Sequence, residues 1–594
     1  MTQTAASPLL TAGRLRWLSA LVGLLIIGGY LFHAWAFRAY INDDAYITFR
    51  YSLFLAEGRG PYFNDGEHVE GYTNFLLMLL MAAVIKVAGP DAAPAAAKVV
   101  GVAGGVLALL ACWGLAARWL RRIPPLGRAA PLLAWFAPVL VALNSAFAVN
   151  SVSGLETTLF AGWITLGLWL FQRSADRGEG HLDSAVSASG ERHPARVARW
   201  TAAGVAFGLG ALTRPEGVMV AAVALGTWAV SGGWRTARRA LVLDAAIVAV
   251  LVLGHSVFRW FFYDGELVPN TYYAKAGSFS GFIRAETYVW GYARHHLAGP
   301  VALACLLPWA GPPVLRRATA PALLTVILST LALFHTGPDW MLGFRALVPY
   351  APAWAALAVT GVAALVGAAQ RRVVPLATAA LALLLALVLW QPAAPSASTP
   401  AVGALAKPSA NNAILGGHRW FLPIAREYAE VCRVGATGYA AGQAALGRWL
   451  REHARPGQTV ALMDIGQVGY LCPALRILDI TGLTDRHIAK APGQFLRKVY
   501  DPRYVLEQKP AYLVLVMRDY RPPPDAGIEA VAFWPMDARI YEHPLFLRHY
   551  YKPRYAPAVE DKLARAAAVY GADRVFQHED PRHVYLLAVY AYRE

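Results

Sequence analysis

Ile41-Asn-Asp-Asp-Ala-Tyr-Ile-Thr-Phe-Arg50 sets two adjacent carboxylates, Asp43 and Asp44, just beyond the first long apolar segment of the chain. That segment covers residues 16–37 and is long enough to cross a bilayer as a helix. Acidic side chains beside a membrane are costly and usually functional. The structural alternative is a helix N-cap or a solvated loop end, because Asp commonly precedes a helix.

Composition indicates a membrane protein. Of 594 residues, 57% are hydrophobic and only 15% are charged, whereas soluble domains average about 25% charged residues. The net charge of +17 does not indicate nucleic-acid binding, because Lys and Arg cluster at the ends of apolar segments, where they determine topology. The four cysteines show no zinc pattern, and Cys432 and Cys472 can form a disulfide if they face an oxidising compartment.

The basic residues predict the orientation of the spans. Arg14 and Arg16 precede an uncleaved first span, which puts the N-terminus in the cytoplasm and the acidic pair outside. The apolar run 75–88 is short and carries Lys86, so we expect a juxtamembrane helix within an outer loop, 38–96. Ten further spans make eleven: 97–118, 130–148, 157–172, 199–213, 217–232, 240–262, 299–314, 319–335, 346–368 and 373–391.

The character of the chain changes after residue 391. We expect a transmembrane domain over 1–391, a linker rich in Ala, Pro and Ser over 392–411, and an external soluble domain over 412–594. An amphipathic helix at 439–453 and short apolar strands at 459–463, 476–480 and 511–516 predict a parallel α/β fold. Asp464 and Asp479 follow two of these strands, where ligands bind in open sheets; they serve equally well as loop formers, and we assign them no catalysis.

The predicted topology gathers acids and bases outside the membrane. A carboxylate there can act as a general base, a pair can hold a divalent cation, and Arg or Lys can bind phosphate. The outward set is Asp43, Asp44, Glu70, Glu156, Arg214, Glu216, Lys275, His335, Asp339 and Arg345.

Several of these residues have structural alternatives. Glu156 can cap the helix that starts at Thr157, and Arg214 with Glu216 can form a self-paired turn. His335 and Trp340 can be interface residues at the end of a span. His255 and Arg259 lie one turn apart near the outer end of a span, where snorkelling is the default.

Six motifs occur together in order: Asp43-Asp-Ala-Tyr-Ile-Thr-Phe-Arg50, Asn64-Asp-Gly-Glu-His-Val-Glu70-Gly-Tyr-Thr-Asn74, Ser153-Gly-Leu-Glu156, Leu212-Thr-Arg-Pro-Glu216, Pro269-Asn-Thr-Tyr-Tyr-Ala-Lys275 and Gly337-Pro-Asp-Trp-Met341. The set resembles polyprenyl-phosphate-sugar-dependent glycosyltransferases of the GT-C superfold, and is most similar to bacterial terminal arabinofuranosyltransferases. The resemblance spans about 40–350, and the segment 479–489 extends it into the soluble domain.

The resemblance implies a polytopic helical membrane enzyme of GT-C type with a C-terminal α/β domain. Asp43 would be the general base, and Asp44 would orient the acceptor or, with Asp43, hold a divalent cation. Glu156 stands where the family commonly has Asp, and Pro338 stands where we expect Gly. The residues implied in substrate binding are Glu156, Arg214, Glu216, Tyr272, Lys275, His335, Asp339, Trp340 and Arg345, with Arg214, Lys275 and Arg345 on the donor phosphate. The external domain would help to bind a glycan.

The function that follows is inverting transfer of a sugar, arabinofuranose by resemblance, from a polyprenyl-phosphate donor in the membrane lipid to a hydroxyl of a cell-envelope glycan or glycoconjugate. It would occur at the periplasmic face of a bacterial plasma membrane. The alternatives are transfer of another lipid-linked sugar to protein or lipid A, and transport of a lipid-linked glycan. A transporter would carry ionisable residues at mid-membrane and often internal repeats. Charges at the outer ends favour the enzyme.

Overall fold

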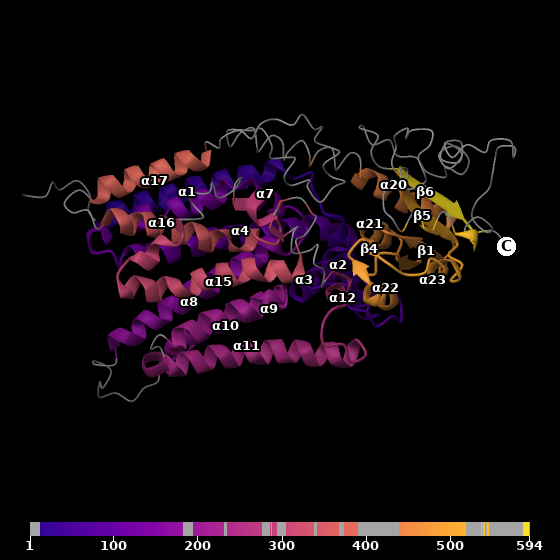
Figure 1. The fold of residues 1–594 in the computed structure, drawn as a ribbon, viewed down its shortest axis with the longest axis horizontal. Helices are drawn as coiled ribbons and strands as arrows, with labels where there is room; N and C mark the ends of the chain where they lie inside the picture. The colour runs from indigo at the N-terminus through magenta and orange to yellow at the C-terminus, as the bar shows by residue number, and fades with distance from the viewer. Residues whose placement is uncertain are drawn as a thin grey trace, which may run out of the picture.

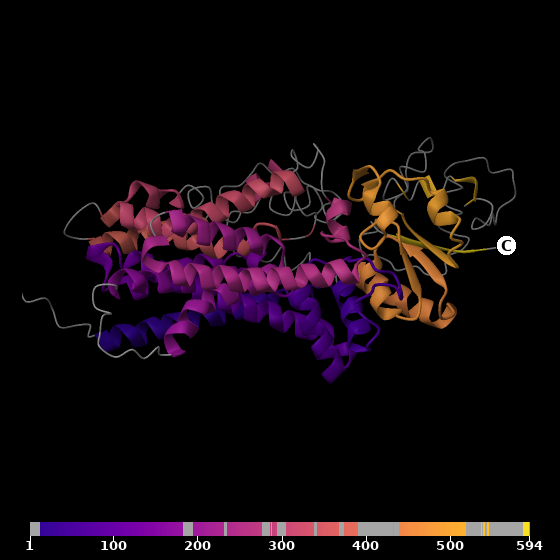
Figure 2. The same ribbon diagram turned by 90° about the horizontal axis from the view of Figure 1, so that it is seen from below.

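The computed structural model describes residues 12–181, 194–230, 234–275, 285–293 except 287, 304–337, 343–367, 373–389, 439–517 and 586–592, with isolated residues 341, 432, 536, 539, 540 and 543–545. Long helices run side by side and a small α/β domain sits at one end of them (Figures 1 and 2). The main helices are α1 (Ala12–Ala36), α4 (Ala93–Leu120), α6 (Phe136–Ala142), α7 (Ser145–Ser151), α8 (Thr157–His181), α9 (Pro194–Thr213), α10 (Glu216–Trp228), α11 (Trp234–Phe262), α15 (Pro313–Thr336), α16 (Ala351–Gly367) and α17 (Val373–Leu389).

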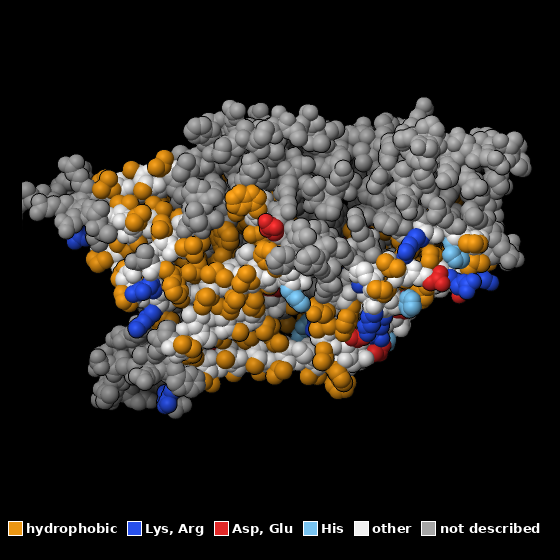
Figure 3. Space-filling model, viewed as in Figure 1, with side chains coloured by type: hydrophobic (Ala, Val, Ile, Leu, Met, Phe, Trp, Pro, Cys, Tyr) orange, Lys and Arg blue, Asp and Glu red, His pale blue; other side chains and the backbone are white. Residues whose placement is uncertain are grey.

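The helical layer has the surface of a multi-pass membrane protein. Five helices among the described residues are long and apolar enough to span a bilayer, or six if the bent pair Ala130–Ala142 and Ser145–Ser151 forms one span. The flank of the layer is largely hydrophobic (Figure 3), with exposed Leu24, Leu25 and Phe32 on α1 and Val250 and Phe261 on α11. The predicted count of eleven stays a prediction, since α9, α10 and α17 are shorter apolar helices.

The predicted span at 299–314 does not form one continuous helix. Residues 299–303 lie outside the described part, and the turns that follow lead into a 3-10 helix at Leu307–Ala310. Pro308, Pro312 and Pro313 explain the break, because proline has no N–H to donate and restricts the residue before it. The following helix α15 begins at Pro313, so Arg316 and Arg317 lie within its first two turns and not between two spans.

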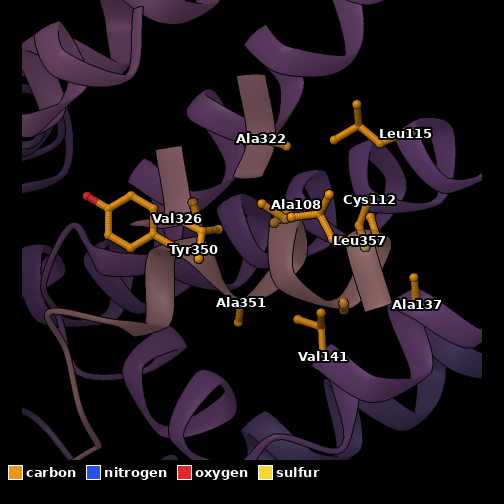
Figure 4. Packing of buried hydrophobic residues seen from close by; sticks show 14 of the residues in the cluster. Ala108, Cys112, Leu115, Ala137, Val141, Ala322, Val326, Tyr350, Ala351 and Leu357 are labelled. Atoms are coloured by element: carbon orange, nitrogen blue, oxygen red, sulfur yellow. The ribbon is translucent and has the colours of Figure 1, made fainter. Parts of the chain in front are cut away.

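Small residues let the central helices pack closely. A Cβ at Gly104 of α4 would lie 2.4 Å from the Cα of Leu159 on α8, so only glycine permits this approach. Ala108 and Cys112 of α4 face Val141 of α6 and Leu357 of α16 in the same buried cluster (Figure 4). This packing fixes the ends of the helices from which the loops of the site emerge.

Two short helices connect the helical layer to the C-terminal domain: α2 (Asp43–Ala56) and α3 (Phe75–Ala88). Helix α3 has the bounds of the predicted juxtamembrane helix and packs against α2. The Lys86 ammonium donates to the carbonyl of Ala56 at the end of α2 (3.2 Å).

The C-terminal domain is the predicted parallel α/β unit. Strands β1 (Thr459–Leu462), β2 (Arg476–Asp479), β5 (Tyr512–Met517) and β6 (Leu586–Ala591) form one sheet in the order β2-β1-β5-β6. β1 pairs in parallel with β2 and β5, and β6, which the sequence analysis missed, is antiparallel to β5. The sheet carries helices α20 (Tyr439–His453), at the predicted bounds, α21 (Ile465–Leu471), α22 (Arg486–Lys490) and α23 (Arg503–Leu506), and a two-stranded ribbon of β3 (Gly493–Gln494) and β4 (Arg497–Lys498).

Cys432 and Cys472 do not form the disulfide considered from the sequence. Both are buried free thiols. Cys472 instead donates to the carbonyl of Gly447 (3.2 Å), and Cys432 belongs to the core cluster of the helical layer. The two cysteines therefore lie in different cores.

Candidate active site

The acidic pair forms the first turn of α2. Asn42 is the N-cap, and its side-chain oxygen accepts from the N–H of Asp44 (3.0 Å). Because Asn42 provides the cap, the alternative in which an Asp merely caps this helix is not what the structure shows. Neither Asp43 nor Asp44 therefore serves as the N-cap of α2.

The Asp43 carboxylate is bound by the C-terminal domain. Its Oδ1 accepts from the N–H of Gln467 (2.8 Å) and its Oδ2 from the N–H of Gly466 (2.9 Å). Burial, then the negative charges of Asp464 and Asp44, raise the pKa of Asp43 to about 7, against the lowering effect of the amide hydrogen bonds. A carboxylate with a pKa near neutrality suits a general base.

Glu156 is the second acid of the site and is fully buried. Its Oε1 accepts from Arg214 Nη1 (3.0 Å) and Arg345 Nη2 (2.9 Å), and its Oε2 accepts from Asn74 Nδ2 (2.9 Å). Burial alone would raise the pKa of Glu156, but the two guanidinium charges outweigh it and lower the pKa to about 2. Glu156 is thus a permanent anion at the centre of an ion-pair network, and more than a helix cap.

Arg214 and Glu216 pair with each other, as the structural alternative predicted. Arg214 donates through Nη2 (2.9 Å) and Nε (3.4 Å) to the two carboxylate oxygens of Glu216. The turn is not isolated, because the third nitrogen of the guanidinium binds Glu156. Arg214 and Arg345, predicted to bind the donor phosphate, are therefore both held on Glu156 in this structure.

Backbone contacts join the Glu156 loop to the start of α2. The N–H of Asn42 donates to the carbonyl of Ser153 (2.9 Å), and Asn42 Nδ2 donates to the sulfur of Met341 (2.7 Å). Gly154 has φ +79, and a Cβ there would lie 3.0 Å from that of Ala45, so the motif needs glycine for both conformation and space.

A series of side-chain hydrogen bonds also links α2 to the Glu156 loop. Thr48, one turn after Asp44, donates to Asn74 Oδ1 (3.1 Å), and Asn74 in turn donates to Glu156. Five of the six motifs of the sequence, which are far apart along the chain, thus meet here.

Glu70 marks a second buried ion pair. Arg259 donates to it through Nε (2.5 Å) and Nη2 (3.0 Å), and His255 stacks on Phe75 with ring centroids 4.3 Å apart. Snorkelling, the default expected for Arg259 and His255, is therefore wrong. The pair fixes the outer loop to the end of α11.

The remaining predicted residues are not gathered into this network. Tyr272, Lys275 and His335 are exposed, and the Lys275 ammonium lies 5.1 Å from the ring of Phe495 in the C-terminal domain. Asp339 and Trp340 lie outside the described residues. The structure places Asp43 and Asp44 in the first turn of α2 and gathers Glu156, Arg214, Glu216 and Arg345 in one ion-pair network, which Asn42 and Asn74 link to α2.

The sequence analysis missed the contribution of α21 to the site. Asp464, Gly466 and Gln467 follow directly after β1, a central strand of the sheet. Ligands bind at the carboxyl ends of strands in open parallel sheets. The position of Asp464 after β1 was therefore the sequence signal for this part of the site. The partner, Asp43, lies more than 400 positions away in the chain, and no local pattern reports such a pairing.

The donor set for a metal ion is incomplete. Among the described residues, no three His, Cys, Asp or Glu side chains form a group that could hold a metal. We therefore derive no step through a cation at Asp43 and Asp44.

The fold is similar to that of a solved bacterial protein, ArnT. ArnT from Cupriavidus metallidurans bound to undecaprenyl phosphate aligns with a TM-score of 0.50 and 15% identity, over 84% of this chain and 92% of that one. The oligosaccharyltransferase of Archaeoglobus fulgidus with a tethered acceptor peptide aligns with a TM-score of 0.49 and 14% identity, over 90% and 73% of the two chains.

Sequence comparison identifies a relative with a named activity. The chain is 29% identical over 319 residues to the terminal β-(1→2)-arabinofuranosyltransferase of Mycobacterium tuberculosis. The aligned region covers 51% of this chain and 46% of that protein. The match thus spans about half the length of the relative. Residues 433–570 match a family described as a domain of unknown function, DUF8728. The resemblance predicted from the six motifs is confirmed.

Proposed function

We propose that this protein is an inverting glycosyltransferase that moves a sugar from a polyprenyl-phosphate donor to a hydroxyl of a cell-envelope glycan. The observation that carries the proposal is a half-buried carboxylate with a raised pKa, Asp43, at a helix start that is hydrogen-bonded to the loop of Glu156 and its charge network. The similarity to an arabinofuranosyltransferase supports arabinofuranose as the sugar. The fold that the chain shares with ArnT bound to undecaprenyl phosphate supports the lipid carrier.

The proposed reaction transfers one proton, forms one bond and breaks another. Asp43 takes the proton of the acceptor hydroxyl, whose oxygen then bonds to the anomeric carbon of the donor. The bond between that carbon and the phosphate oxygen breaks, and polyprenyl phosphate leaves with the electron pair. Attack opposite to the leaving group inverts the anomeric configuration.

Arginine and lysine provide the expected phosphate contacts. Arg345 and Arg214 lie in the network of Glu156, and Lys275 is exposed beside the C-terminal domain. A phosphate that binds the two arginines must share them with Glu156, because charge-assisted hydrogen bonds already hold them. Among the described residues Lys275 forms no ion pair, and its ammonium lies over the ring of Phe495, so we propose it as the first phosphate ligand.

A panel of donors tests the proposal. Purified full-length protein is incubated with polyprenyl phosphates that carry arabinofuranose, mannose or aminoarabinose, with an arabinan oligosaccharide acceptor, with and without chelator. We expect transfer from the arabinofuranose donor with inverted configuration. Transfer from none of the donors would contradict the proposed class, and transfer from a different donor alone would contradict the sugar.

A further inference from the structure

Helix α21 of the C-terminal domain is bound at both ends by residues of α2. At its start, the N–H groups of Gly466 and Gln467 donate to Asp43. At its end, Arg50 donates to the carbonyls of Gly469, Cys472 (3.1 Å) and Leu475 (2.7 Å). The anion therefore meets N–H groups of the first turn of α21, and the cation meets carbonyls of its last turn, of its C-cap residue and of the loop beyond, which is the charge order that the ends of a helix prefer.

The lengths of the two helices match. Asp43 and Arg50 are seven residues apart in α2, which corresponds to about 10 Å along a helix. Helix α21 has seven residues and therefore a similar length. Because Asp43 and Arg50 sit at opposite ends, α21 has one register along α2 that satisfies both.

Glycines bring the helices into contact. A Cβ at Gly466 would lie 2.0 Å from the carbonyl oxygen of Asp43 and 2.6 Å from its Oδ2. A Cβ at Gly469 would lie 3.1 Å from the ring of Phe63 and 3.5 Å from Cδ of Arg50. At Gly466 no larger residue fits without displacing the carboxylate.

The local cap of α21 is replaced by this contact. Asp464 is its N-cap residue, yet the Asp464 side chain makes no capping hydrogen bond. The first-turn N–H groups that an N-cap would normally bind are used on Asp43 instead. Helix α21 thus gives up its own cap to hold a carboxylate of another domain.

We propose that Gly466 and Gln467 are positioning residues of the transfer reaction, which hold Asp43 through their backbone N–H groups so that it faces the acceptor hydroxyl. The inference rests on the proposed function. Each carboxylate oxygen has two lone pairs and gives one to an amide, so one on each oxygen remains for the acceptor proton. The C-terminal domain is then part of the catalytic centre, and transfer requires it to be docked on α2.

The test removes one hydrogen bond at a time from the full-length protein. Gln467→Pro deletes the N–H that binds Asp43, and a proline is tolerated in a first helical turn, where the N–H has no partner within the helix. Gln467→Ala is the matched control, because it removes the same side chain but keeps the N–H. Gly466→Ala keeps every N–H and displaces the carboxylate by its Cβ.

We measure kcat, the KM of the donor and the melting temperature with the donor that the wild type uses. Gln467→Pro and Gly466→Ala should each lower kcat about tenfold or more, as expected for a lost hydrogen bond to a charged group. The donor KM should stay unchanged, and the kcat of Gln467→Pro should lie about tenfold or more below that of Gln467→Ala, which keeps the N–H. Assays are run below the melting temperature of every variant.

The outcomes separate three cases. A wild-type kcat in both Gln467→Pro and Gly466→Ala overturns the inference, even if their melting temperatures fall, because Asp43 would then only hold the domain in place. If Gln467→Pro does not fold, Gly466→Ala decides by the same kcat criterion, and if neither folds at the assay temperature, both are assayed at reduced temperature and judged likewise. Absence of transfer by the wild type contradicts the proposed function instead.

Discussion

At the scale of single residues, Glu156 shows how ion pairs and hydrogen bonds compensate for the free-energy cost of burying a charge. It has no exposed surface, and three donors from three separate segments satisfy its carboxylate: Asn74, Arg214 and Arg345. Removing one partner of a buried pair leaves the other charges without compensation. Loss of the Glu156 charge would therefore destabilise the fold, because Arg214 and Arg345 would stay buried without their shared anion.

We predict that Glu156→Gln lowers the free energy of unfolding by about 3–5 kcal/mol, since two arginines lose their shared anion. The matched control is Glu57→Gln, which removes a partly exposed partner of Arg59 and should cost at most about 1 kcal/mol. Thermal melts in detergent at pH 7 measure both. Equal melting temperatures for the two variants would contradict the central place of Glu156.

The same residue predicts a pH dependence of stability. Its folded pKa of about 2 lies below the ordinary value of 4.5. Its stabilising contribution is therefore present above the ordinary pKa and is lost as the pH falls from there toward 2. The melting temperature of the wild type should fall more steeply across this window than that of Glu156→Gln; parallel curves would contradict the assignment.

Asp43 predicts a pH dependence of activity. A general base acts when deprotonated, so the transfer rate should fall as the pH drops below about 7, the raised pKa of Asp43. Asp464→Asn removes a neighbouring negative charge that raises this pKa, so the acid limb of the pH–rate profile should move to lower pH. A limb that stays in place in Asp464→Asn would contradict the electrostatic account.

At the scale of elements, the short apolar helix α3 decides the topology of the outer loop. Its length and Lys86 predicted a juxtamembrane helix, and the structure packs it on α2 with Lys86 bonded to Ala56. Val87 is 89% exposed, whereas all four native cysteines are buried. A single cysteine at Val87→Cys therefore reports the side of the membrane.

We predict that Val87→Cys in intact cells reacts with a membrane-impermeant maleimide from the periplasm. Arg16→Cys, at the start of α1, is the control and should react only after permeabilisation, because the N-terminus is predicted to be cytoplasmic. Labelling of Val87→Cys from the cytoplasmic side alone would show that α3 is a transmembrane span and would invert the predicted topology after it.

The elements also show what the sequence could predict. Periodicity and apolar runs located α3, α20 and three strands of the sheet, because these are properties of neighbouring residues. The break before α15 was missed because the apolar run continues through Pro308 and Pro312. Strand β6 was missed because it joins the sheet from more than 60 residues beyond β5.

At the scale of the whole molecule, the two domains meet at the acidic pair. The resemblance predicted that Asp43, Glu156, Arg214 and Arg345 belong to one site, because a family resemblance relates positions that are far apart along the chain. It did not indicate that the two arginines pair with Glu156 or that α21 binds Asp43, because the partners lie up to 424 positions apart. Such contacts are set by how the domains pack.

The central claim is that Asp43 is the general base of sugar transfer, and the most direct test compares Asp43→Asn with Asp44→Asn. Initial rates are measured with the donor that the wild type uses, together with donor binding and melting temperature. We predict that Asp43→Asn lowers the rate by at least about 100-fold, the usual contribution of a general base, with donor binding retained, whereas Asp44→Asn loses less. A wild-type rate of transfer by Asp43→Asn would contradict the account.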